Sequence, residues 1–96
     1  MTYVIAATYV VKAGEADAVL HALQQMTPPT RDEAGNVGYQ AHRSVEDPHV
    51  FFLYEEYADA DAFQAHTETD HFERWIKGEA WPRLDSRKVV RAEPFS

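Results

Sequence analysis

Four stretches of the chain carry the patterns of apolar and polar positions that are typical of β-strands. Thr2 to Lys12 is rich in Val, Ile and Tyr and is apolar on both faces, so we expect this strand to be central in its sheet. Val37 to Val45 and His49 to Tyr57 flank the turn Glu46-Asp47-Pro48, and this arrangement predicts a hairpin. Leu84 to Ala92 is broken by charge, which favours a strand that is exposed or at a sheet edge.

Apolar residues at helical spacing follow the first strand. Between residues 15 and 26 they recur at i, i+3, i+4 and i+7 and predict an amphipathic helix. Thr27-Pro28-Pro29 then interrupts the hydrogen-bond ladder, because a proline cannot donate and its ring crowds the preceding turn. Pro29 is tolerated in a first turn, so we expect a kink and a short continuation through Glu33. The inward stripe of this helix consists of Ala16, Val19, Leu20, Leu23 and Met26.

The segment after the third strand switches from the period of a strand to that of a helix. Asp59 or Asp61 can cap a helix on which Phe63 and His66 lie three residues apart, and therefore on one face. A second helix follows at once. Its expected caps are Thr69 and Asp70, and its apolar stripe is Phe72, Trp75, Ile76 and either Glu79 or Ala80.

The order strand, helix, strand, strand, helix, strand is the split βαβ arrangement of a ferredoxin-like α+β fold, with four antiparallel strands and helices on one face. The 96 residues are expected to form a single domain, residues 1–96. A domain of this size buries only about two-thirds of its unfolded surface, so a lone monomer would be marginally stable. We therefore expect the uncovered face, with Phe52 and Tyr54, to pair with a second copy and to complete a barrel.

Composition narrows the classes of partner. Acidic residues outnumber basic ones 16 to 9, the formal charge is −7, and we expect no lysine or arginine cluster, which argues against nucleic acid and anionic membranes. There is no cysteine, which excludes disulfides and thiolate metal sites. No basic leader is present and no apolar run approaches the ~20 residues of a membrane span, so the expected location is cytoplasmic.

His66 and Glu55 are the leading candidates for chemistry. An imidazole on a helix that faces the sheet can act as acid or base near neutral pH, although His66 could equally be a hydrogen-bonded core histidine. Glu55 shares strand parity with three bulky side chains, so its carboxylate is expected either to have a raised pKa or to be paired. The alternative for Glu55 is a salt bridge to Arg43 or Arg74.

Metal and cofactor sites are not expected. His66 and His71 are five residues apart across a helix break, and no third ligand has suitable spacing. His71 is instead expected to be a rim or capping residue, and Trp75 a core residue that could also form the wall of an aromatic pocket. No glycine-rich loop follows a strand, so the sequence does not predict a nucleotide site. No serine or cysteine occupies a nucleophile elbow.

The run Leu-Tyr-Glu-Glu-Tyr-Ala-Asp-Ala-Asp-Ala-Phe-Gln-Ala-His-Thr-Glu-Thr-Asp-His-Phe, residues 53–72, resembles the antibiotic biosynthesis monooxygenase family. The similarity extends to Gly14, to Glu33-Ala34-Gly35 followed by Gly38-Tyr39, and to Asp47-Pro48, so it covers nearly the whole chain. It implies a ferredoxin-like fold that pairs into a dimeric α+β barrel. Members include oxygenases that turn phenols into quinones, haem-degrading enzymes and an isomerase of a signalling sugar phosphate.

The motifs of this family separate some of these activities. Haem-degrading members use an Asn, a Trp and a His at positions that match Ala7, His66 and Ile76 here, so haem degradation is not expected. The isomerase is similar in its Phe-His followed by Pro-His-Tyr, where this chain has Ala-His and Asp-His-Phe. Quinone-forming oxygenases of polyketide pathways carry an Asn, a Trp and a Tyr, and the matching positions are Leu53, Tyr57 and Phe63, which argues against the same polyketide substrate.

The resemblance therefore implies a homodimeric monooxygenase without cofactor that acts on a small phenol or similar acidic aromatic. The protein would remove a proton from the substrate, with His66 and Glu55 as the base, and the electron-rich anion would itself reduce dioxygen. Two alternatives stay open: an isomerase of a small metabolite, with or without a phosphate, and a non-enzymatic small-molecule-binding dimer. The expected substrate-binding residues are Leu53, Tyr57, Phe63, His71 and Trp75, and a phosphate would need the cations Arg31, Arg43, Arg74 and Lys77.

Overall fold

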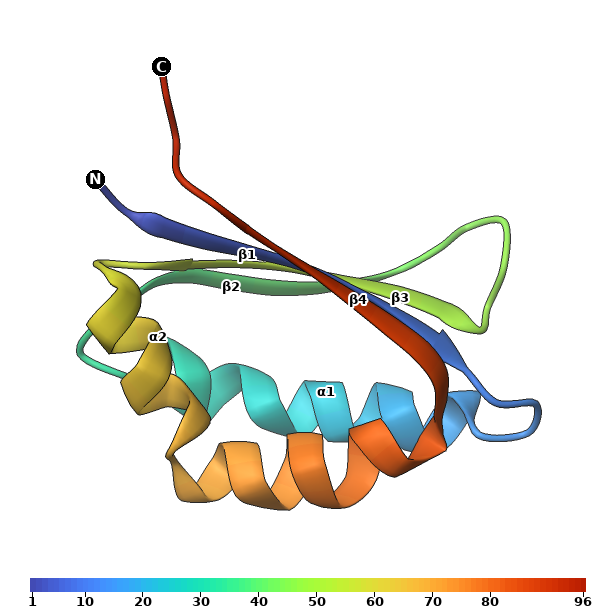
Figure 1. Cartoon of the computed structure of the whole chain (residues 1–96). Coiled ribbons are helices and arrows are strands. Elements are labelled where there is room, and N and C mark those ends of the chain that lie inside the picture. The colour runs from blue at the N-terminus through green and yellow to red at the C-terminus, as the bar shows by residue number, and fades with distance from the viewer.

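A computed structural model describes all 96 residues and has the expected order of elements. The strands form one four-stranded antiparallel sheet in the order β2-β3-β1-β4, and the helices lie on one face of it (Figure 1). The predicted ferredoxin-like α+β fold is therefore confirmed. The elements are β1 (Tyr3–Val11), α1 (Ala16–Arg31), β2 (Asn36–Arg43), β3 (Val50–Tyr57), α2 (Ala60–Thr67), η1 (Phe72–Ala80), η2 (Trp81–Arg83) and β4 (Leu84–Ala92).

The positions of the strands follow from their polarity. β1 lies between β3 and β4, as its apolar character predicted, and β4 is an edge strand whose residues are exposed from Asp85 onward. β2 ends at Arg43, short of the predicted end at Val45, because Ser44 begins the hairpin turn. The Ser44 hydroxyl oxygen accepts hydrogen bonds from the backbone N–H groups of Glu46 and Asp47, which fixes that turn.

Helix α1 packs its apolar stripe against the sheet and continues through both prolines to Arg31. The predicted continuation is confirmed, but the helix ends before Glu33. The backbone N–H of Glu33 donates to the carbonyl of Thr30, and this tighter turn closes the helix. Leu20 is only partly buried, and the fully buried part of the stripe is Val19, Ala22, Leu23 and Met26.

Helix η1 differs from the ordinary α-helix that the sequence predicted. It is wound as a π-helix with i→i+5 hydrogen bonds, such as the one from the Trp81 N–H to the Ile76 carbonyl. In this wider turn residues four apart stay on one face, as in an α-helix, but a residue three apart is rotated further from it, so Phe72, Ile76 and Ala80 are buried while Trp75 is only partly buried. None of the helices is long and apolar enough to cross a membrane.

The outer face of the sheet, away from the helices, carries exposed apolar side chains. Phe52 pairs with Thr8, and Ala6 pairs with both Tyr54 and Val90, so these side chains share one face. Phe52, Tyr54 and Val90 are 39%, 43% and 47% exposed. The expected placement of Phe52 and Tyr54 on the uncovered face is therefore correct.

Candidate active site

Two carboxylates and two histidines from separate parts of the chain lie in contact on the helix side of the sheet. We call Glu33, Glu55, His66 and His71 the Glu–His cluster. Nδ1 of His66 lies 2.9 Å from Oε2 of Glu33, and Nε2 of His71 lies 2.6 Å from the same oxygen. Nε2 of His66 lies 3.7 Å from Oε1 of Glu55, which accepts a hydrogen bond of 2.7 Å from the Tyr57 hydroxyl. The cluster thus connects a fully buried tyrosine with the partly exposed side chain of His71.

Strand alternation and helix capping position the buried half of the cluster. Alternation along β3 turns Glu55 and Tyr57 toward the helices, as their parity predicted. Asp59 caps α2 by accepting a hydrogen bond of 2.8 Å from the backbone N–H of Ala62. His66 then lies in the last turn of α2 and is the one buried residue of that helix. The expectation that His66 faces the sheet is therefore correct.

The other half of the cluster lies on turns. The Thr69 hydroxyl accepts a hydrogen bond of 3.2 Å from the Phe72 N–H, as a capping residue does. This cap fixes the turn that carries His71 at the start of η1. The side chain of His71 makes no capping hydrogen bond at this helix start, and its ring instead reaches the carboxylate of Glu33.

Gly35 allows the turn that carries Glu33 to approach α2. A Cβ atom at Gly35 would clash with the side chain of Ala62, so a glycine is required for this close approach. The carbonyl of Gly35 accepts a hydrogen bond of 2.8 Å from the Ala58 N–H, which ties the turn to the end of β3. Glu33 thereby reaches His66, although the two residues are 33 positions apart.

An aromatic shell surrounds the imidazole of His66. Its ring centroid lies 5.1 Å from that of Phe72, 5.2 Å from Tyr57 and 6.1 Å from both Phe63 and Tyr39. The Phe63 ring is stacked with it, at an interplanar angle of 28°, and the Phe72 ring meets it edge-on. Only 2% of His66 is exposed, so the imidazole lies in a largely dry environment.

Burial shifts the protonation equilibria in the cluster. Burial raises the pKa of Glu55 to about 7, and the charge of Glu33 adds to this shift while the Tyr57 hydrogen bond opposes it. Burial lowers the pKa of His66, against the effect of its hydrogen bond to Glu33. Burial and the charge of Glu55 raise the pKa of Tyr57 far above its ordinary value, so this phenol stays protonated. Near neutral pH the cluster combines a neutral imidazole with a carboxyl group that can gain or lose a proton.

The hydrogen bonds assign the tautomer of His66. A carboxylate only accepts hydrogen bonds, so Nδ1 of His66 carries the proton that it shares with Glu33. In the neutral ring Nε2 is then unprotonated, and it faces Glu55. Glu33 orients this imidazole much as the acidic residue of a catalytic triad orients its histidine. The arrangement can therefore accept a proton at Nε2.

Glu55 forms no salt bridge with an arginine, so the alternative that paired it with Arg43 or Arg74 is wrong. Arg43 donates to a backbone carbonyl at 2.9 Å, and the guanidinium of Arg74 lies 4.5 Å from the ring centroid of Trp75. The reason is geometric, because strand alternation turns the Glu55 carboxylate inward to a tyrosine and a histidine.

Three members of the cluster are of the residue types that bind metal ions. The donor atoms of Glu33, His66 and His71 lie within 4.8 Å of one another. No third ligand has suitable spacing in the sequence, and the fold instead brings Glu33 from a distant part of the chain to the two histidines. Ligands at about 2.0–2.1 Å from a tetrahedral metal lie about 3.3 Å apart. The distances of 2.6 and 2.9 Å are instead those of hydrogen bonds, so a metal would have to spread this group.

The structure brings some of the predicted site residues together at the Glu–His cluster and places Leu53 and Trp75 elsewhere. Leu53 is part of the hydrophobic core, and Trp75 packs edge-on against His21 of α1 at 5.6 Å. Sequence reasoning did not propose Glu33 as a site residue. The signal was present, because Glu33 opens a run that carries the family resemblance. The predicted residues that the structure does bring together are Glu55, Tyr57, Phe63, His66 and His71.

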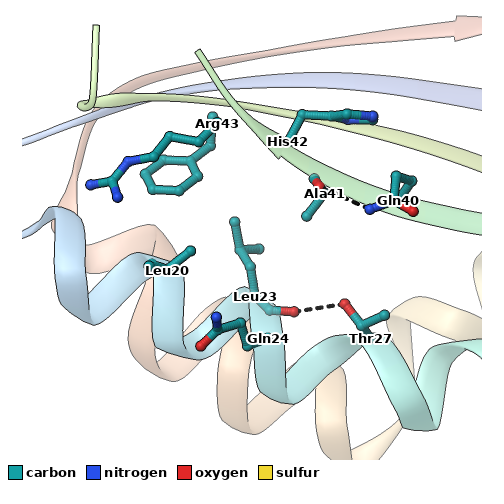
Figure 2. A pocket seen from close by; sticks show the side chains of 9 residues that line it. Leu20, Leu23, Gln24, Thr27, Gln40, Ala41, His42 and Arg43 are labelled. Atoms are coloured by element: carbon teal, nitrogen blue, oxygen red, sulfur yellow. Dashed lines mark hydrogen bonds between the residues drawn. The ribbon is translucent and has the colours of Figure 1, made fainter. Parts of the chain in front are cut away.

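The cavities of the structure are not lined by the Glu–His cluster itself. One cavity of about 230 Å³ lies between α1 and β2, with His42 and Arg43 on its β2 side (Figure 2). Another, of about 360 Å³, lies between α2, η1 and β4, and we call it the β4 cleft. Its walls include Phe63 and Phe72, which both contact the ring of His66. The β4 cleft is thus the one cavity whose walls touch the imidazole.

Comparison with known proteins gives a clear assignment. The family model described as antibiotic biosynthesis monooxygenase matches residues 1–78. The chain belongs to the antibiotic biosynthesis monooxygenase family. All four members of the Glu–His cluster lie within the matched residues, whereas β4 lies outside them. No curated protein matches the sequence.

Several solved structures resemble this member of the family over nearly its whole length. A Pseudomonas aeruginosa protein is 26% identical, with a TM-score of 0.89, and the match covers 99% of this chain and 95% of that one. A Shewanella oneidensis protein is 26% identical, with a TM-score of 0.88 and coverage of 95% and 88%. A Nitrosomonas europaea protein, named as an inferred antibiotic biosynthesis monooxygenase, is 28% identical, with a TM-score of 0.90 and coverage of 97% and 89%. The resemblance that the sequence indicated is therefore confirmed.

Proposed function

We propose that this protein is a monooxygenase that oxidises a small phenolic substrate with dioxygen and takes the electrons from the substrate itself. The observation that carries the proposal is the buried Glu55 carboxyl group beside His66. Burial raises its pKa to about 7, and the unprotonated Nε2 of His66 lies 3.7 Å away. Proton abstraction from a phenol requires a base whose pKa lies near the working pH.

The proposed roles follow from the contacts. Glu33 orients His66, Nε2 of His66 accepts the phenolic proton, and Glu55 shares that proton. His71 touches the same carboxylate oxygen of Glu33 and is partly exposed, so it connects the buried base with solvent. Removal of the base typically lowers the rate by ~10² to 10⁴.

The reaction balances without an external reductant. The phenolate formed by proton transfer gives electrons to dioxygen, and a C–O bond forms at a ring carbon that bears hydrogen. The resulting hydroperoxide loses water, which breaks the O–O bond and leaves a quinone. One oxygen atom ends in the quinone and the other in water, so one phenol and one dioxygen give one quinone and one water. The protein supplies the base and a dry site, in which a buried charge and its partner interact more strongly than in water.

Oxygen uptake with a panel of hydroquinones and naphthols tests the proposal. We expect consumption above the uncatalysed rate and, with ¹⁸O₂, one labelled atom per quinone formed from a monohydric naphthol. Glu55→Gln should lower the rate of oxygen uptake. Glu56→Gln is its matched control, because Glu56 is the next residue of β3 and points to the outer face. An uptake rate equal to the uncatalysed rate for every substrate would exclude an oxygenase of this class and favour the isomerase or binding alternatives.

We also propose that two copies pair through the outer face of the sheet. The exposed side chains of Phe52, Tyr54 and Val90 give this face an apolar patch on a small domain. A typical obligate interface buries on the order of 2,000 Å² or more, which would offset the small core of each copy.

A further inference from the structure

The β4 cleft has a composition that is unusual for this acidic protein. Its lining includes the rings of Phe63, Phe72 and Trp81 and the cationic side chains of Lys77, Arg87 and Arg91, and it contains no carboxylate. The whole chain has 16 acidic and 9 basic residues. A third of all the basic residues therefore line one cleft, so the expectation of no lysine or arginine cluster does not hold on this part of the surface.

The two arginines of the cleft have no acidic partner. No carboxylate lies within ion-pair distance of Arg87 or Arg91, whereas Lys77 pairs with Glu73 at 3.5 Å. Arg83, the last residue of η2 directly before β4, pairs with the carboxylates of Glu15 and Glu79. Uncompensated arginines in a chain of charge −7 favour an anion as their partner.

Each cation lies over one of the aromatic rings. The guanidinium of Arg87 lies 3.5 Å from the ring centroid of Trp81, and that of Arg91 lies 5.7 Å from Phe63. A stacked guanidinium keeps its N–H groups at the edge of its plane, where they can bind a carboxylate with two hydrogen bonds. The simpler reading is that these contacts only cover apolar surface, but that reading does not account for the absence of carboxylates around them.

Strand register places the arginines on the same side of the sheet as the Glu–His cluster. Arg87 pairs with Tyr9 and Arg91 pairs with Ile5, and both partners are buried under the helices. Lys88 lies between them and points to the outer face. The cleft therefore opens on the helix side, where Phe63 separates it from His66.

We propose that the β4 cleft binds an aromatic carboxylate, with the ring against Phe63, Phe72 and Trp81 and the carboxylate on Arg87 and Arg91. This inference rests on the proposed function, and it names the class of phenol that the enzyme takes: one that carries a carboxylate on its ring. The carboxylate holds the molecule at β4, and the phenolic hydroxyl is directed past Phe63 toward His66. The two arginines lie outside residues 1–78, which the family model matches, so membership of the family does not by itself predict this preference.

Binding of 2-naphthoate and of its neutral counterpart 2-naphthamide, measured by titration calorimetry, tests the proposal without any turnover. We expect the carboxylate to bind more tightly than the amide, and the variant with Arg87→Gln and Arg91→Gln to bind it on the order of 10-fold less tightly. Lys88→Gln is the matched control, because it removes one cation from the opposite face of the same strand and leaves affinity unchanged. Quenching of tryptophan fluorescence by 2-naphthoate should be lost in Trp81→Phe and kept in Trp75→Phe.

The proposal is overturned if 2-naphthoate and 2-naphthamide bind equally, if the double variant keeps wild-type affinity, or if no binding is seen at about 1 mM. It is also overturned if inorganic phosphate displaces 2-naphthoate at equal concentration, because the site would then recognise any anion. Glu55→Gln is expected to keep the binding of 2-naphthoate. If 2-naphthoate binds as expected but no phenol stimulates oxygen uptake, the proposed function is refuted and the binding proposal stands. If the protein takes up oxygen with hydroxynaphthoates and the arginine variants do so at the wild-type rate, the binding proposal is refuted and the proposed function stands.

Discussion

Glu55→Gln removes the charge of the buried carboxyl group and nearly preserves its shape. The amide oxygen of Gln can still accept the hydrogen bond of 2.7 Å from the Tyr57 hydroxyl. The variant cannot ionise, and the amide NH2 group that replaces one oxygen does not titrate in this pH range. Its stability as a function of pH therefore reports directly on the titration of Glu55.

The magnitude follows from the raised pKa. Burial raises the pKa of Glu55 from 4.5 to about 7, so the folded protein holds this proton more tightly than the unfolded chain does. The resulting stabilisation is fully present below the unfolded value of 4.5 and is lost as the pH rises through about 7. A difference of about 2.5 pKa units, at 1.36 kcal/mol per unit, corresponds to about 3 kcal/mol.

Urea denaturation of both proteins between about pH 4.5 and pH 8 measures this effect. The free energy of unfolding of the wild type minus that of Glu55→Gln should fall by about 3 kcal/mol across this range. Subtracting the two free energies of unfolding removes the pH dependence that His66 contributes to both proteins, which has the opposite sign. The pKa of His66 is lowered by burial, so its contribution is present above its unfolded value and is lost as the pH falls through the folded one. A constant separation between the two stability curves would show that Glu55 does not titrate in this range, and the proposed base would be wrong.

Three further predictions concern the base, the assembly and the cluster. His66→Gln should lower turnover by ~10² to 10⁴ and change the melting temperature little. His66→Ala should lower turnover as well and should also lose about 1 to 3 kcal/mol of stability. Wild-type activity in both variants would show that His66 is a packing residue. Sedimentation at micromolar concentration should show a dimer for the wild type and a monomer for Phe52→Asp, which places a charge in the apolar outer face; a monodisperse wild-type monomer would contradict this. Elemental analysis of the purified protein should show no stoichiometric metal, because Glu33 and the two histidines lie at hydrogen-bond distances, and one equivalent of zinc or iron would instead make them ligands.

The sequence by itself determined the order of the elements and the direction of several side chains. Periods of two and of about 3.6 residues require only that one face of each element be buried, so they are visible in the chain without knowledge of its partners. The same local rule turned Glu55 inward on β3 and put His66 on the face of Phe63, and both placements are correct. The capping roles of Asp59 and Thr69 were readable for the same reason, because a cap bonds to the backbone a few residues away.

Only the tertiary structure decided what the inward side chains meet. Glu33 reaches His66 because Gly35 lets one turn pack closely against α2, and no local pattern encodes a contact between residues 33 positions apart. The cationic cleft likewise exists only because strand register sets Arg87 and Arg91 opposite η1 and α2. Such contacts depend on how whole elements pack, and that packing is determined by the combined interactions of many residues. The direction of a side chain within its element depends on the local backbone alone.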